Sequence, residues 1–228
     1  EREQDTIRQE RLADPVIAAK RQSVRREIAA AKIKGIAFRH ELTGEDGETP
    51  EPVIEDWHFS AGYYQSGKRE GQPIVMREAK RQALGIFTTV APDQTEADRE
   101  IFALFLVSKA FEGDAKDAGY VEGNNEYKLT MTPEEAKQLL YWNYYASKSR
   151  SPRTTWGSGQ FRYIENEVTA QILVDAVKLK EGTEDEELAQ RFLDHYCSIH
   201  DVNLEELPEP HGALVIQAEE EAEATTEN

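Results

Sequence analysis

The residues best suited to molecular recognition lie between positions 136 and 164, a window without acidic residues in a chain of net charge -17. Its five basic residues are Lys137, Lys148, Arg150, Arg153 and Arg162. Its seven aromatic residues are Tyr141, Trp142, Tyr144, Tyr145, Trp156, Phe161 and Tyr163. Cationic side chains bind phosphates, flat rings stack on bases, and both are common in protein interfaces. The window therefore predicts a binding surface, with a folded core as the alternative.

We expect this surface to combine the end of one helix with the Arg-rich loop that follows it. Tyr141, Tyr145 and Trp156 are the rings that we expect to be at least partly exposed, with Arg150 and Arg153 beside them. The predicted partner-binding residues are Tyr141, Tyr145, Lys148, Arg150, Arg153, Trp156, Arg162, Arg25 and Arg26. If all three rings are buried, the window is core.

Charge is strongly segregated along the chain. Residues 181–228 contain fifteen acidic residues and one basic residue, whereas residues 20–39 contain seven basic residues and one acidic residue. Residues 41–56 hold seven acidic residues and no basic one. This layout resembles that of bacteriophage and bacterial single-strand-binding proteins, and the resemblance implies an acidic tail that competes with nucleic acid for a basic groove. Local potential matters more for such binding than net charge.

The segment from Gly62 to Arg69 matches the GxxxxGK part of a phosphate-binding loop. The next residue should be Ser or Thr to bind magnesium, but it is Arg69, and the sequence after it is typical of a turn. We therefore interpret the segment as a hairpin connection.

A third candidate is the stretch His195, Cys197, His200 and Asp201, whose side chains include plausible zinc ligands. His200-Asp201 is similar to the two-residue core of HD-type metal phosphohydrolases. On a helix, however, His195 lies on a different face from Cys197 and His200. We therefore expect a small buried thiol and a histidine at a helix end, without metal or other cofactor.

The pattern along the chain predicts elements of both kinds. The expected helices span 1–34, interrupted at Asp14-Pro15, then 95–111, 132–147, 164–179 and 183–199. A capping box formed by Thr132 and Glu135 predicts the start of the helix over 132–147. The helix over 183–199 is expected to bury Leu188, Phe192, Tyr196 and Ile199. The expected strands span 36–42, 53–64 (paired with the first), the beginning of 73–83 before a helix, 127–131 and 213–217. Residues 113–125 are interpreted as a loop.

We therefore expect an α+β fold, with a small, mostly antiparallel sheet in the N-terminal half and helices dominating the C-terminal half. The predicted organisation is an N-terminal basic helix or arm (1–34), one domain (35–217) and an acidic tail (218–228). One cysteine excludes an internal disulfide framework, and no segment is long and apolar enough for a bilayer span. We expect an intracellular, cytoplasmic protein, or part of a virion assembled there, with no membrane partner.

The absence of a catalytic motif favours a non-catalytic structural or adaptor component of a larger assembly, such as a phage particle or nucleoprotein complex. Its expected partners are other protein subunits. The first alternative is a single-stranded nucleic-acid-binding accessory protein that its acidic tail inhibits. The second is a metal-dependent hydrolase.

Overall fold

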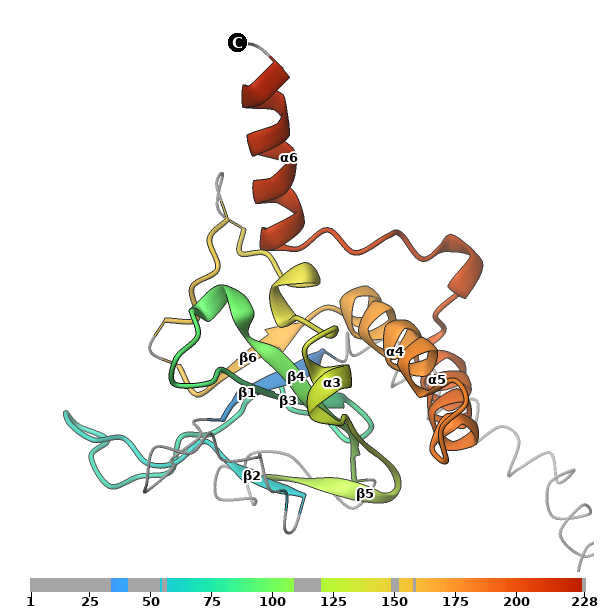
Figure 1. Cartoon of the computed structure of the whole chain (residues 1–228). Coiled ribbons are helices and arrows are strands. Elements are labelled where there is room, and N and C mark those ends of the chain that lie inside the picture. The colour runs from blue at the N-terminus through green and yellow to red at the C-terminus, as the bar shows by residue number, and fades with distance from the viewer. Residues whose placement is uncertain are drawn as a thin grey trace, which may run out of the picture.

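Six strands form one curled, mixed sheet in the computed structural model (Figure 1). The structure describes residues 34–40, 54, 57–108, 120–148, 152–157 and 159–226. The strands are β1 (Gly35–Arg39), β2 (His58–Ser60), β3 (Leu84–Thr89), β4 (Glu100–Val107), β5 (Tyr120–Thr130) and β6 (Phe161–Ile164). Their order is β2-β5-β4-β3-β1-β6, in which β1 and β3 run parallel and the other neighbours antiparallel. With helices in the C-terminal half, this confirms the predicted α+β class.

One face of the sheet is filled with aromatic rings. Phe38 of β1 lies beside Phe87 of β3, and Gly85 lies opposite Phe105 of β4. A Cβ atom at Gly85 would overlap the Phe105 ring, so only glycine allows this packing. The ring of Phe59, on the far strand β2, lies 4.0 Å from that of Phe38. The sheet must therefore curl until β2, at one edge, approaches β1 across this aromatic core.

Two of the helices, α4 (Asn166–Lys180) and α5 (Glu186–His200), cover the opposite face. The other helices are α3 (Pro133–Ala136) and α6 (Ala213–Thr226), with 3-10 turns η1 (Glu96–Asp98), η2 (Tyr141–Asn143) and η3 (Leu204–Glu206). The α4 and α5 helices lie side by side in Figure 1. Thr169 of α4 would block a side chain at Gly35, and Phe192 of α5 lies 5.4 Å from the Tyr127 ring. Burial of Phe192 and Tyr196 confirms the predicted apolar face of α5.

The predicted helix over 95–111 is wrong. Asp98 does accept a hydrogen bond from the Thr95 backbone N–H at 3.0 Å, as a capping box requires, but it starts only the short turn η1. The chain then enters β4, between β3 and β5, where residues 101–107 are all buried. A run that is apolar on every side suits a strand buried on both faces as well as a central helix, so periodicity could not distinguish them.

Five other expectations are corrected. The helix expected over 132–147 ends at Ala136, and the chain continues into η2. Residues 213–217 form the start of α6 rather than a strand, and β5 already begins at Tyr120 within the expected loop. Residues 73–83 contain neither a strand nor a helix, and β2 pairs with β5 rather than with β1. The sequence interpretation also missed β3. Most of the expected N-terminal helix, residues 1–33, and residues 41–53 lie outside the described residues.

A buried ion pair connects α3 to the end of α4. The Lys180 ammonium lies 2.7 Å from a carboxylate oxygen of Glu135, and both side chains are almost fully shielded from solvent. The same oxygen accepts a hydrogen bond from the Thr132 backbone N–H at 2.7 Å, which completes the capping box predicted at this position. Removing one member of such a pair leaves an uncompensated buried charge.

We predict that Lys180→Met will lower the free energy of unfolding by about 3–5 kcal/mol, because Glu135 would lose its charge partner. Urea denaturation measures the change. Lys178→Met is the matched control on the same helix, since the Lys178 side chain is 66% exposed and pairs with Asp175 at the surface. Its effect should stay within about 1 kcal/mol. Equal losses in the two variants would contradict a special role of the buried pair.

Candidate interaction site

The centre of the site is the buried guanidinium of Arg99, which connects several elements. It donates hydrogen bonds to both carboxylate oxygens of Glu96, at 2.5 and 2.9 Å, and to the Thr88 hydroxyl at 3.2 Å. Thr88 in turn donates to the Phe38 carbonyl at 2.9 Å. The Arg99 carbonyl accepts from the Tyr141 N–H at 2.8 Å. One residue thus ties β1, β3, η1 and η2 together.

Two guanidinium groups pack against Trp156. The Arg99 guanidinium carbon is 4.7 Å from the centre of the indole rings, and that of Arg162 is 5.3 Å from it. The indole N–H donates to the Gly159 carbonyl at 2.6 Å. Arg162 also lies over the Tyr145 ring and donates to its hydroxyl at 3.3 Å. We call Arg99, Tyr141, Tyr145, Trp156 and Arg162 the arginine–aromatic cluster.

The cluster corrects the exposure expected for the predicted surface. Tyr141 and Trp156 are buried, and Tyr145 is half-buried. Burial raises the pKa of Tyr141 well above its ordinary value, so its phenol stays neutral. Two of the three rings are thus part of the core, because cation–π contacts and apolar packing stabilise them in a buried position. The structure brings Arg162 together with these rings. The sequence had predicted all of them to lie on the binding surface.

The remaining predicted binding residues fall into two groups. Lys148 and Arg153 are exposed beside the cluster. Arg25, Arg26 and Arg150 lie outside the described residues. Arg99 was not among the predicted site residues, because it follows an apparent helix start. Arginine is rarely buried unless it is paired, so a lone arginine before an apolar run is a signal for a buried, paired cation.

The arginine–aromatic cluster also anchors the first turn of α6. Backbone N–H groups of Gly212 and Ala213 donate to the carbonyls of Asn143 and Tyr145, at 2.8 and 3.0 Å. The Gln217 side chain donates to the Pro152 carbonyl at 3.0 Å. A Cβ atom at Gly212 would overlap the backbone of Asn143, so glycine is needed for this close approach. The direction of α6 is therefore determined by η2 and the loop at Pro152.

Beyond this anchor, α6 projects away from the sheet (Figure 1). Residues 218–225 are all exposed. The helix contains four glutamates, Glu219, Glu220, Glu221 and Glu223, and no basic residue. His211 makes an ion-pair contact with Glu219 at 3.0 Å if it is protonated. The result is an acidic projection next to exposed Lys148 and Arg153.

A second projection is the hairpin of residues 62–73, which confirms the interpretation of the GxxxxGK match. Tyr63 forms a bridge with Pro73, and Tyr64 exchanges backbone hydrogen bonds with Gly71 and Gln72 at 2.9 and 3.0 Å. Gly62, Gly67 and Gly71 adopt positive φ angles, which glycine tolerates best. The Tyr63 ring is 57% exposed, and Lys68 and Arg69 are exposed on the same hairpin.

In the third candidate site, the stretch from His195 to Asp201, both histidines make structural contacts. The His195 ring stacks on Tyr127 at 4.5 Å, and His200 Nε2 lies 2.8 Å from the Gln82 carbonyl oxygen. Burial raises the pKa of the half-buried Cys197 thiol, which therefore stays protonated. Within the described part of the chain, no group of three or more His, Cys, Asp or Glu side chains is arranged to hold a metal ion.

Comparison of this chain with protein-family models, with curated proteins and with solved structures finds no match. Across the residues that the structure describes, no helix combines the length and apolar character needed to cross a membrane. The features that can indicate a function are therefore the two projections and the cluster that anchors one of them.

We predict that His200→Gln will reduce the pH dependence of stability in acid. Burial lowers the pKa of His200 below its ordinary value of 6.5, so the unfolded chain binds a proton that the folded chain does not. The free energy of unfolding should therefore fall as the pH drops below 6.5, with a limiting slope of about 1.4 kcal/mol per pH unit from this group. Urea denaturation from pH 7 down to pH 5 measures the slope.

The control for this measurement is His211→Gln, which replaces an exposed histidine and should keep the slope of the unmodified protein. If His200→Gln shows the same slope as this control, the imidazole of His200 does not account for the acid dependence.

Proposed function

We propose that this protein is a non-catalytic adaptor or structural component of a larger assembly, which it joins through charged projections. The observation that carries the proposal is α6, an acidic helix held at its first turn and exposed over residues 218–225. The single free thiol, Cys197, is compatible with assembly in the reducing cytoplasm.

The physical state of α6 favours a partner with a basic surface. A helix of 14 residues is marginally stable in water unless a face of it is packed. The glutamates lie toward the C-terminal end, where the helix dipole disfavours negative charge. A basic partner would relieve both penalties by covering the helix and neutralising its carboxylates, and it would be steered toward the acidic projection over a distance.

The base of α6 carries the opposite charge, which suits docking in a defined orientation. Lys148 and Arg153 are exposed where the loop at Pro152 contacts Gln217. A partner that meets both the acidic helix and these cations would have one favourable orientation, since a rotated partner would place like charges together. Specific assemblies need such a unique register more than they need raw affinity.

We predict that Glu220→Lys together with Glu221→Lys will weaken binding of the partner subunit at least about tenfold, because the replaced charges lie on the docking surface. The measurement is native mass spectrometry of the tagged protein isolated at low salt from its own cells, followed by titration with the recovered subunit.

The matched control is Glu122→Lys together with Glu126→Lys, which makes the same change in net charge at exposed positions of β5. It should leave the complex intact. Isolation of the unmodified protein as a monomer without any bound subunit would sink the assembly proposal.

A second candidate is a single-stranded nucleic-acid-binding accessory protein. It is favoured by the exposed Tyr63 ring on the hairpin that also carries the exposed Lys68 and Arg69, and by the exposed cations Lys148 and Arg153. The Trp156 indole is buried and two guanidinium groups pack against it, so that ring is unsuitable for stacking on a base. This geometry makes nucleic-acid binding the weaker of the two proposals.

If this second candidate is correct, Arg150→Glu with Arg153→Glu should abolish the gel shift of a single-stranded oligonucleotide. Deletion of 219–228 should tighten binding, because it removes competing carboxylates. Loss of two phosphate contacts would also reduce the slope of log affinity against log salt by about 1.4. The absence of any gel shift by the tail-deleted protein at low salt would contradict this candidate.

A further inference from the structure

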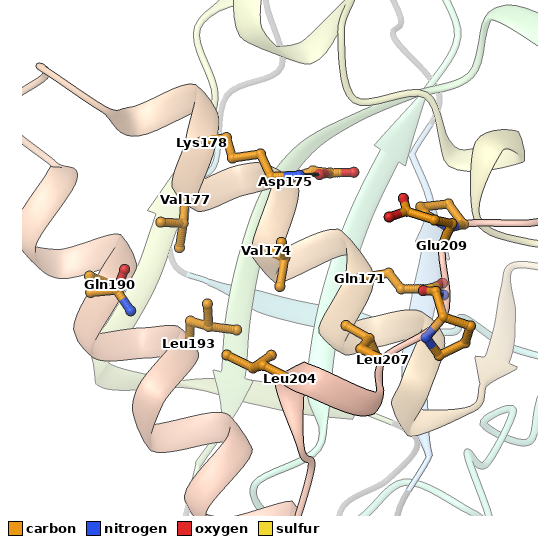
Figure 2. A pocket seen from close by; sticks show the side chains of 12 residues that line it. Gln171, Val174, Asp175, Val177, Lys178, Gln190, Leu193, Leu204, Leu207 and Glu209 are labelled. Carbon is orange, nitrogen blue, oxygen red and sulfur yellow. Dashed lines mark hydrogen bonds and ion pairs between the residues drawn. The ribbon is translucent and has the colours of Figure 1, made fainter.

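An open groove lies between α4, α5 and the segment that contains η3 (Figure 2). It has a volume of about 380 Å³. In Figure 2 the side chains of Val174, Leu193 and Leu204 converge to form its apolar floor. Leu204 is 41% exposed, which is unusual here for a large apolar residue. The Gln171 side chain donates to the Pro208 carbonyl at 2.7 Å and holds the far wall in place.

The rim of this groove is acidic. Asp175 and Glu209 lie at one end of it, and Lys178, which pairs with Asp175 at 2.7 Å, is its single basic lining residue. A second hollow shares Val177 and Gln190 with the groove and continues it along α4 and α5. Four more glutamates line this continuation: Glu181, Glu184, Glu186 and Glu187. Together the two hollows form an acidic groove with an apolar floor, which suits a basic amphipathic helix.

The chain itself contains a segment of this chemistry. Residues 16–33, outside the described residues, contain five basic residues and one acidic residue. Ile17, Val24, Ile28 and Ala31 recur at helical spacing and predict one narrow apolar stripe between basic flanks. A stripe of this kind complements the groove in both polarity and charge.

We propose that the acidic groove binds the chain's own basic segment, residues 16–33, as an amphipathic helix. The apolar stripe covers Val174, Leu193 and Leu204, and the basic flanks face the glutamates of α4 and α5. Residue 34 joins this segment to β1, where Gly35 packs against Thr169 in the first turn of α4. The groove residues Val174 and Val177 lie about one to two turns further along that helix. This docking is intramolecular and separate from the docking of α6 to a partner.

Limited proteolysis of the full-length chain tests the proposal. Trypsin cuts after lysine and arginine, and docking should protect the bonds after Lys20, Arg21, Arg25 and Arg26. We expect Leu204→Asp, which places a charge on the groove floor, to speed cleavage at these bonds by at least about tenfold, because docking must open before the protease can act. Raising the salt concentration to about 0.5 M should also speed cleavage of the unmodified protein, by screening the charge contacts.

Tyr63→Asp is the matched control, since it replaces an exposed apolar side chain far from the groove. It should leave the cleavage rate unchanged. A second variant, Ile17→Asp with Val24→Asp, alters only the segment and should reproduce the effect of Leu204→Asp without changing the folded domain. Thermal unfolding of each variant verifies that the domain remains folded.

A zero-length carbodiimide cross-linker provides an independent readout. We expect it to join Lys20 or Lys32 to Glu184 or Glu187 within monomers, as peptide mapping would show. Equal cleavage rates in the unmodified protein, the groove variant and the control would overturn the proposal. So would cross-links found only in dimers, because the segment would then occupy the groove of a second copy.

Discussion

The buried guanidinium of Arg99 is the interaction on which the arrangement around the site depends. A cation in the interior is stable only if its donors are satisfied, and Arg99 uses Glu96, Thr88 and the Trp156 ring for this purpose. Each partner comes from a different part of the chain. Satisfying one charge therefore determines how η1, β3 and the loop before β6 meet. The buried ammonium of Lys180 is likewise paired, with Glu135, and this pair joins α3 to α4.

The consequences of the Arg99 interaction extend to the surface. Trp156 and Tyr141 pack around the buried charge, Tyr145 is held by Arg162, and the carbonyls of Asn143 and Tyr145 receive the first turn of α6. The basic–aromatic window is thus mainly the support of an acidic projection rather than a stacking platform. This arrangement places Arg99, Tyr141 and Trp156 inside and leaves exposed charge on α6, on the hairpin and along the groove. Exposed charges arranged in this way suit the binding of an oppositely charged partner.

Parts of this fold could be predicted from residues that are close together in the sequence. The capping box at Thr132, the turn glycines between Gly62 and Gly71, and the apolar face of α5 each depend on residues close in sequence, and each was predicted correctly. The strand β4 was mistaken for a helix because its residues are apolar on all sides, and its neighbours β3 and β5 come from distant parts of the chain. The pairing of β2 with β5 was missed for the same reason. Tyr141 and Trp156 were placed at the surface because their cationic neighbours suggested solvent.

The amino-acid sequence alone was enough to establish the α+β class, the segregation of charge, and the helices that begin near positions 166 and 186. These follow from composition, spacing and caps, which act over a few residues. Tertiary contacts were needed to determine whether the apolar run over 101–107 forms a strand or a helix, which rings are buried, and whether α6 projects from the domain. Those outcomes depend on which distant groups satisfy Arg99 and fill the curled sheet, and such long-range complementarity has no local signature.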